Sequence, residues 1–507
     1  RCRGASMHTF VDPLRRALCV GPDSTAIIFD DRPFTYRELW SRCRRFAAVL
    51  QQAGALPGDR VAILAANSAQ YIETYLAVPA AGMVIVPLNT RHAEPELRYA
   101  LKDAAAKVLL TDREPGALRQ LVDTVIMMPE EYEALIDGAD EAELGVGVTE
   151  NSLAGLFYTG GTTGASKGVM LSHRNLIANT FQFMTVSPPM RDNVFLIMAP
   201  LFHAAGSNGV LGGVWSASCQ IPLKVFDPAV ALNLIEKYRV THTLGVPAMI
   251  AAISELQHKQ PRDVSSVRLV AHGGSPIATQ VVRRASAAFP SAEFVHVYGM
   301  TEASPLLTGL RHEERLLDVD RGRSCGQPLI GVQVRIVDAD GRDVLPGEVG
   351  ELMAYGPNIM RGYWNKPEQT AEVLQDGWYR SGDMGYMDAE GFVFLVDRAK
   401  DMIISGGENV YCSEVEEVLY KHVAVLEAAV FGVPDEQWGE AVHAVVVPRT
   451  EVAATELIAF CRQHIAGYKI PKDISFSTKE LPKSGPGKIL KRELRAPFWA
   501  GRDRKVN

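Results

Sequence analysis

The sequence predicts an α/β protein, with a large N-terminal part of stacked, mostly parallel sheets and a small α+β part at the C-terminus. Three observations support this. Short apolar runs alternate with helix-length segments over the first two thirds of the 507 residues, as strands buried on both faces of a parallel sheet do. After about residue 324 the runs follow one another through turns, which indicates an antiparallel, barrel-like β region. A last segment carries its own strands and helices.

The first third begins with a helix and continues with buried strands. Thr35 and Glu38 have the spacing of a capping box, apolar residues then recur at helical spacing to Leu50, and Gly54 ends the pattern. We expect buried strands at the apolar runs 61–64, 83–87, 108–110, 194–198, 243–246, 269–271 and 293–297.

In the last third we predict strands at 332–337 and 349–354, joined by a turn at 338–341, and a further strand at 392–396. Ser413 and Glu416 have the spacing of a second capping box, and strands are expected at 442–447 and 474–476. We place a domain boundary near Lys400, which gives an N-terminal domain of residues 1–399 and a C-terminal domain of residues 400–507.

Composition excludes several classes of protein. Apolar residues make up 47% and charged residues 22%, so a disordered chain is excluded. A formal net charge of −7 argues against a nucleic-acid binder, because neutralising phosphates needs a basic face. The seven cysteines form no C-x-x-C pair, which disfavours metal and disulfide frameworks. We expect neither a transmembrane span nor a signal peptide, and therefore a cytoplasmic location.

A glycine- and threonine-rich stretch, 158–168, is the most informative motif. Its glycines let backbone N–H groups converge on an anion, and threonine hydroxyls and Lys167 add donors suited to phosphate oxygens. A Walker loop requires Ser or Thr after the lysine, whereas Gly168 follows Lys167. The stretch therefore indicates a phosphate-binding loop of another kind.

This loop resembles the signature of the acyl-adenylate-forming (ANL) superfamily, which includes acyl- and aryl-CoA synthetases, luciferases and adenylation domains of peptide synthetases. The resemblance covers essentially the whole chain and is closest to the acyl-CoA synthetase type. Ser166 and Gly160 depart from the common pattern without removing a polar group. Further motifs follow in the family's order at 272–276, 298–302, 379–383 with 397–400, and 482–488.

The resemblance implies a ligase that joins a carboxylic acid to AMP and then passes the acyl group to coenzyme A. No general base is needed, because a carboxylate with a pKa near ~4 is already ionised at neutral pH. By resemblance, Glu302 binds Mg²⁺, Thr163 and Lys167 bind the ATP phosphates, and Lys488 enters the site for adenylation. A mobile C-terminal domain would rotate at Lys400 between the two half-reactions.

The resemblance also assigns the remaining ligands of the nucleotide. Asp383 would accept the ribose hydroxyls and Arg398 would reach the ribose or phosphate, although Arg398 also lies in a charged run of the kind that is usually solvated. Tyr298 would stack on adenine or belong to the core. The other expected ATP contacts are Thr159, Gly160, Gly161, Thr162, Gly164, Gly274, Ser275, Pro276, Gly299, Met300 and Thr301.

The resemblance also implies which residues bind coenzyme A and which bind the carboxylic acid. Gly407 would let the pantetheine arm pass. Trp438 and the cluster 468–472, which contains Lys469 and Lys472, would meet the CoA nucleotide. His203 would lie at the mouth of the acyl tunnel or be a core histidine. The acyl pocket would draw on Gln182, His203, Ala204, Leu244, Val297 and Ser304.

These positions include no Arg or Lys, so we expect an apolar monocarboxylic acid: a medium or long fatty acid first, an aryl or cinnamyl-type acid second. A stand-alone ligase loading a carrier protein, a light-emitting oxygenase and a non-catalytic nucleotide sensor are the alternatives. The expected partners are the acid, ATP, Mg²⁺ and CoA, and a homodimer is compatible with the sequence.

Overall fold

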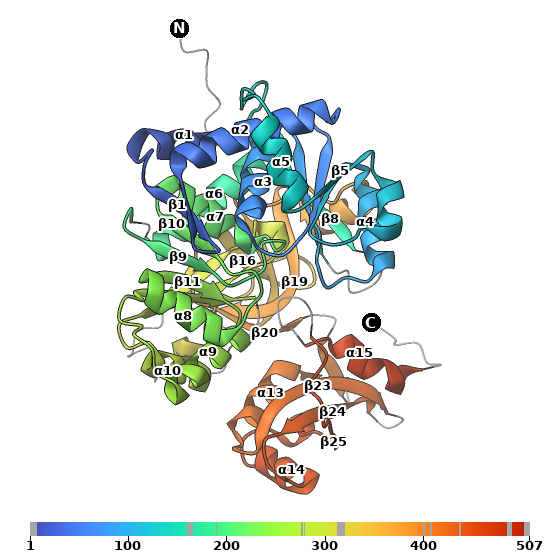
Figure 1. The fold of residues 1–507 in the computed structure, drawn as a ribbon. Coiled ribbons are helices and arrows are strands. Elements are labelled where there is room, and N and C mark those ends of the chain that lie inside the picture. The colour runs from blue at the N-terminus through green and yellow to red at the C-terminus, as the bar shows by residue number, and fades with distance from the viewer. Residues whose placement is uncertain are drawn as a thin grey trace.

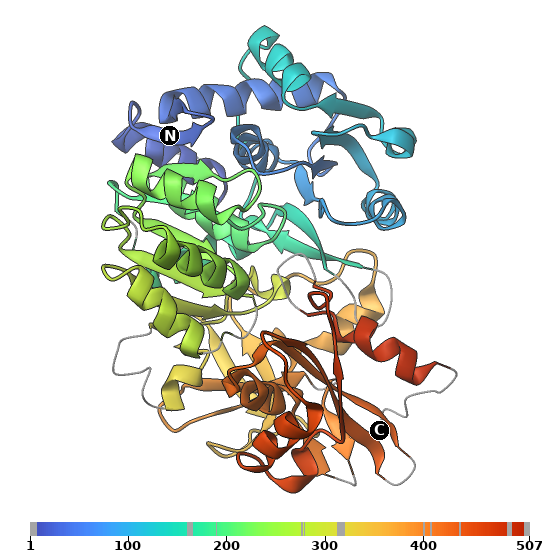
Figure 2. The same cartoon turned by 60° about the horizontal axis from the view of Figure 1, so that its bottom comes forward.

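The computed structural model describes residues 8–159, 166–188, 190–274, 277, 279–311, 320–398, 401–405, 408–435, 438–483 and 489–500. A large body carries most of the chain, and a small C-terminal lobe is joined to it close to β20 (Figure 1). When the molecule is turned, the C-terminal lobe comes forward and overlaps part of the body (Figure 2).

A long mixed sheet lies at the centre of the body. Its middle strands are parallel, and its edges are antiparallel at β2 and at β14 with β15. In spatial order the strands are β15 (Gln327–Pro328), β14 (Thr308–Arg311), β13 (Glu293–Tyr298), β12 (Leu269–Gly273), β11 (His242–Gly245), β9 (Val194–Ile197), β10 (Cys219–Pro222), β1 (Thr25–Phe29) and β2 (Arg32–Thr35).

Helices cover both faces of this sheet because successive strand residues point to opposite sides. Val270 and Phe294 pack with α8 (Pro228–Tyr238), α9 (Pro247–Lys259) and α10 (Thr279–Ala288). Their neighbours Ala271 and Val295 pack in a different core with α6 (His173–Val186) and α7 (Ala205–Ser216). The predicted α/β class is therefore confirmed.

A second sheet, parallel except for its last pair, is built in the same way. Its strands, in spatial order, are β6 (Thr124–Met127), β5 (Ala106–Thr111), β3 (Arg60–Leu64), β4 (Val84–Pro87), β7 (Leu153–Thr159) and β8 (Lys167–Ser172). Every residue of α3 (Ala69–Ala80) is buried, as expected of a helix enclosed on all sides. The other helices here are α1 (Val11–Val20), α2 (Tyr36–Gln52), α4 (Glu94–Ala104) and α5 (Glu130–Gly138).

The predicted antiparallel region forms a third sheet. It contains β16 (Gln333–Val337), β17 (Gly350–Tyr355), β19 (Trp378–Met387), β18 (Leu374–Gln375) and β20 (Val393–Arg398), with α12 (Pro367–Val373) leading into β18. The turn predicted at 338–341 joins β16 to β17. Gly341 there has φ +79°, a conformation that favours glycine.

The C-terminal lobe has its own sheet and core. Its strands are β21 (Ile403–Ser405), β22 (Glu408–Val410), β23 (Val425–Asp435), β24 (Gly439–Pro448) and β25 (Asp473–Phe476), and its helices are α13 (Cys412–Lys421), α14 (Ala454–Arg462) and α15 (Lys491–Arg495). Arg398 ends a strand of the body and Ile403 begins a strand of the lobe. Lys400 lies outside the described residues, so the boundary at this position stays a prediction.

The two predicted capping boxes have different outcomes. Thr35 and Glu38 form the first, at the start of α2, as predicted. The second is wrong: α13 begins at Cys412 with no side-chain cap. The Ser413 hydroxyl instead donates to the carbonyl of Val396, and Glu416 Oε1 accepts from the N–H of Val430 at 2.7 Å. Both side chains therefore form hydrogen bonds with the backbone of other strands and do not cap the helix.

In the part of the chain that the structure describes, no helix combines the length and the apolar character needed to cross a membrane.

Candidate active site

Several of the predicted nucleotide residues meet at the carboxyl ends of β12 and β13. These parallel strands are neighbours, and their carboxyl ends lie at one edge of the sheet, the usual place for ligands in open α/β sheets. Gly274 follows β12 with φ +84°. Gly299 follows Tyr298, and a Cβ there would lie 2.0 Å from the carbonyl oxygen of Pro305, so only glycine fits. At these two glycines, therefore, no side chain covers the backbone at this edge of the sheet.

The stem of the predicted phosphate loop is a pair of antiparallel strands. Thr159 ends β7, Lys167 begins β8, and the two residues are cross-strand partners. The two ends of the loop therefore lie side by side. Its predicted phosphate ligands, Gly160, Gly161, Thr162, Thr163 and Gly164, lie outside the described residues.

Glu302 and Lys167 contact the same tyrosine. Glu302 lies in the short helix η2 (Thr301–Ala303), next to Met300. The Tyr363 hydroxyl donates to Glu302 Oε1 at 2.9 Å, and Lys167 Nζ lies 4.7 Å from the centre of the Tyr363 ring. The structure thus brings the predicted metal carboxylate and the predicted phosphate lysine to one place.

Asp383 is held beside Tyr298. It lies in β19, is 7% exposed, and its Oδ2 accepts a hydrogen bond of 2.6 Å from the Tyr298 hydroxyl. The Tyr298 ring is half-buried against the main core, so this tyrosine is both a core contact and a site residue. Arg398 is the backbone partner of Asp383 across β19 and β20, and its side chain is outside the described set.

The predicted acid-binding residues belong to several elements near this edge. Leu244 lies in β11 and Val297 in β13, while His203 and Ala204 directly precede α7. Burial lowers the pKa of His203 to about 4, with smaller effects from Arg91 and His92, so its imidazole is neutral at pH 7. Its Nε2 is buried and has no hydrogen-bond partner among the described residues.

Gln182 and Ser304 are joined through a buried asparagine. Asn358 is fully buried, and its carbonyl oxygen accepts from the Ser304 hydroxyl at 2.7 Å. Gln182 Nε2 lies 3.4 Å from Asn358 Oδ1, and Gln182 Oε1 accepts from Asn179 Nδ2 at 2.9 Å. Protein groups already use these polar atoms, so a direct contact of either side chain with the acid stays a prediction.

Two of the residues expected to meet CoA lie close together in the C-terminal lobe. Trp438 is 41% exposed, and Lys472 Nζ lies 5.5 Å from its ring centre. Lys469 is paired instead with Glu414, at 2.7 and 2.8 Å. An exposed indole beside a lysine can stack on a base and bind a phosphate.

Other predicted residues fall outside the description. Lys488 is one of them, because residues 484–488 are not described. The described residues on either side, Lys483 and Ile489, form an isolated antiparallel bridge. Also outside are Ser275, Pro276, Lys400 and Gly407.

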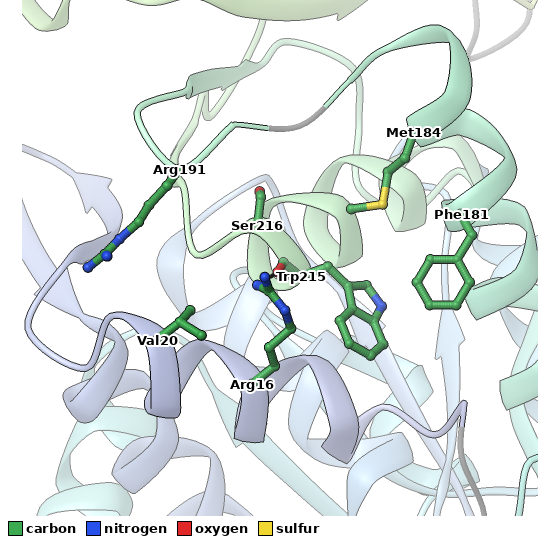
Figure 3. A pocket seen from close by; sticks show the side chains of 7 residues that line it. All are labelled: Arg16, Val20, Phe181, Met184, Arg191, Trp215 and Ser216. Atoms are coloured by element: carbon green, nitrogen blue, oxygen red, sulfur yellow. Dashed lines mark hydrogen bonds between the residues drawn. The ribbon is translucent and has the colours of Figure 1, made fainter.

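An open hollow of about 490 Å³ lies elsewhere, between α1, α6 and α7. Arg16, Phe181 and Trp215 point toward it (Figure 3). A neighbouring smaller hollow is lined by Asn193 and His242, at the amino-terminal ends of β9 and β11. The smaller hollow therefore lies at the sheet edge opposite the predicted nucleotide residues, so we do not assign these hollows to the nucleotide site.

Two residues at the site, Tyr363 and Asn358, were not predicted from the sequence. Neither stands in a motif of its own, and each reaches the site through contacts with residues far away in the sequence.

Comparison with known proteins identifies the family. The AMP-binding enzyme family matches residues 14–364, and the AMP-binding enzyme C-terminal domain matches residues 414–488. A feruloyl-CoA synthase of Amycolatopsis is 42% identical over 492 residues, covering 96% of this chain and 98% of the relative.

Other relatives have different names. A long-chain-fatty-acid–CoA ligase of Bacillus subtilis is 35% identical and covers 93% of this chain and 91% of the relative. A fatty acid–[acyl-carrier-protein] ligase of Streptomyces coeruleorubidus is 34% identical, with 96% of both chains covered. The o-succinylbenzoate CoA synthetase of B. subtilis, solved with ATP and a magnesium ion, has a TM-score of 0.86 at 31% identity and covers 95% of this chain and 98% of that one.

The fold and the site thus define an ATP-binding, adenylate-forming enzyme. The chain belongs to the AMP-binding enzyme family, as an AMP-forming acid–thiol ligase of the acyl-CoA synthetase type.

The residues at the site fit a magnesium ion that arrives with ATP. Mg²⁺ is usually bound by one or two carboxylates together with substrate phosphates. Glu302 offers such a carboxylate close to Lys167. In the described ranges no group of three or more His, Cys, Asp or Glu side chains could hold a metal unaided. When bound, the ion would neutralise charge on the phosphates.

Proposed function

We propose that the chain activates a cinnamic-type aryl acid with ATP and transfers the acyl group to coenzyme A. The observation that carries this choice is the difference in identity between relatives: 42% to a feruloyl-CoA synthase against 35% to a long-chain-fatty-acid–CoA ligase. The aryl acid was the second of the two classes expected from the sequence, and the comparisons favour it over the fatty acid.

The reaction would proceed in two displacements. A carboxylate oxygen of the acid attacks the α-phosphorus of ATP, the bond to the β-phosphate oxygen breaks, and pyrophosphate leaves. The CoA thiolate then attacks the acyl carbon, the bond to the phosphate oxygen breaks, and AMP leaves. Charge neutralisation and in-line positioning are the main requirements of the first step. We assign them to Lys167 and Thr301 at the phosphates, Asp383 at the ribose and Lys488 from the lobe.

His203 gives the aryl acid further support. A buried polar atom without a partner costs about 1–3 kcal/mol. The neutral imidazole of His203 has such an atom, Nε2, among the described residues. A ring hydroxyl on a cinnamic-type acid could satisfy it, whereas an alkyl chain could not.

A panel of acids tests the proposal. Ferulate, unsubstituted cinnamate, hexanoate and palmitate are each assayed with ATP, Mg²⁺ and CoA for AMP and acyl-CoA. We expect the highest kcat/KM with ferulate, and a His203→Leu variant should lose more activity with ferulate than with cinnamate. A higher kcat/KM with palmitate would contradict the aryl assignment.

The same assay addresses the acceptor. The carrier-protein ligase among the relatives makes a phosphopantetheine carrier the second candidate. AMP formation that rises with CoA and yields acyl-CoA supports the ligase we propose. If AMP formation does not depend on CoA and requires a carrier protein, the carrier protein is the acceptor and CoA is not.

A further inference from the structure

A segment far along the chain, residues 360–364, lies against both parts of the candidate phosphate site. On one side, the backbone N–H of Trp364 donates to the carbonyl of Gly168 in β8 at 2.8 Å. On the other side, the Met360 N–H donates to the carbonyl of Glu302 at 2.8 Å. This segment therefore fastens the strand at the end of the phosphate loop to the turn that carries the proposed metal carboxylate.

Tyr363, within this segment, makes both contacts through its side chain as well. It is 6% exposed, its hydroxyl donates to Glu302 Oε1 at 2.9 Å, and its ring lies 4.7 Å from Lys167 Nζ. A hydrogen bond to a carboxylate is stronger than one between neutral groups, and an aromatic face attracts an ammonium ion. One side chain thus contacts two groups of opposite charge.

A second buried tyrosine interacts with Tyr363. Tyr379 is 4% exposed, and its interaction with Tyr363 contributes, after burial, to the raised pKa of Tyr379. It lies in β19, the strand that also carries Asp383. Burial raises the pKa of both tyrosines, so both stay neutral and can donate.

We propose that Tyr363 is a positioning residue that fixes the carboxylate of Glu302 relative to the ammonium of Lys167, so that magnesium and the ATP phosphates are bound together. The inference rests on the proposed nucleotide site. Mg²⁺ demands near-octahedral geometry, so a carboxylate that can rotate binds it less well. Partners that orient a metal ligand typically contribute about 10- to 100-fold in metal affinity.

The test is the binding of ATP alone, measured by calorimetry with and without Mg²⁺. Tyr363→Phe removes the hydroxyl and keeps the ring beneath Lys167. We expect the gain in ATP affinity on adding Mg²⁺ to fall on the order of 10-fold or more, with Mg²⁺-free binding changed less than about twofold. Tyr363→Leu removes the ring too and should also weaken Mg²⁺-free binding.

Tyr132 provides a matched control. Its hydroxyl donates to Glu73 Oε2 at 2.9 Å, and it is fully buried against Phe46. Tyr132→Phe should lower the thermal midpoint and leave the Mg²⁺ response as it is. If Tyr363→Phe does the same, Tyr363 is only structural and the inference is overturned.

Failure of the site itself would look different. If ATP binding to the wild-type protein does not depend on Mg²⁺, the proposed nucleotide site is wrong, and this inference is wrong with it. If Tyr363→Phe does not fold, Tyr363→Met takes its place, because methionine is a flexible apolar side chain without the hydroxyl. A loss of the Mg²⁺ response in that variant supports the inference, and an unchanged response overturns it.

Discussion

Replacing Asp383 by asparagine tests the role that we propose for this carboxylate at the ribose of ATP. Asp383 is 7% exposed and already accepts one hydrogen bond, from the Tyr298 hydroxyl at 2.6 Å. Asparagine keeps the shape and one acceptor oxygen, loses the charge, and places a donor where the second oxygen was. A ribose hydroxyl that donated to the carboxylate therefore loses its partner.

The magnitude follows from the kind of bond that is lost. A hydrogen bond to a charged group contributes about 1.5–3 kcal/mol. One tenfold change corresponds to about 1.4 kcal/mol, so the KM for ATP should rise on the order of 10- to 150-fold. The fold should persist, because the Tyr298 hydroxyl can still donate to the amide oxygen.

The assay is acid-dependent pyrophosphate exchange with ATP and with its 2′-deoxy and 3′-deoxy analogues. The wild-type protein should lose affinity for each analogue, whereas Asp383→Asn should lose little more, because the bond is already absent. Asp388→Asn is the control, since Asp388 lies in the turn after β19 and its Oδ1 accepts the Glu390 N–H at 2.9 Å. An Asp383→Asn variant with an unchanged KM, or with an undiminished penalty for both analogues, would refute the assignment.

Three further outcomes are expected. Lys488→Ala should lose adenylation by about 10²- to 10³-fold and keep thioester formation from supplied acyl-AMP; surviving pyrophosphate exchange would argue against this role. Glu73→Gln should lower the free energy of unfolding, measured by urea denaturation, by about 1.5–3 kcal/mol, because the buried Arg42 loses its carboxylate partner at 2.5 Å and keeps Glu133 at 2.8 Å; an unchanged free energy of unfolding would contradict this expectation. Burial lowers the pKa of His173 to about 3. When the pH falls below the usual pKa of histidine, the unfolded chain therefore protonates this imidazole and the folded chain does not. The free energy of unfolding should therefore drop by about 1.6 kcal/mol for this group between pH 6.5 and 5, with a shallower pH slope in His173→Asn; an equal slope in that variant would count against it.

Signals that are local in the sequence predicted the structure well. The capping box at Thr35 depends on residues three apart, and it forms as expected. The buried strands were recognisable because both of their faces are apolar. Since parallel strands place their carboxyl ends at one edge, the motifs after β12 and β13 could be expected to meet there.

Features that depend on distant contacts were not predictable. Ser413 and Glu416 had capping-box spacing, yet partners in β20 and β23 took their side chains. Tyr363 reaches Glu302 across 61 positions of sequence, and no local pattern marks that contact. The class of acid was ranked from small and uncharged residues such as Ala204, which leave room without specifying its shape.

The central claim is that the acid becomes a mixed anhydride with AMP before the acyl group reaches CoA. A direct measurement is the fate of a heavy-oxygen label placed in the carboxylate of ferulate. If a carboxylate oxygen attacks the α-phosphorus, one labelled oxygen should appear in AMP and none in pyrophosphate. AMP without the label, recovered alongside feruloyl-CoA, would contradict the account.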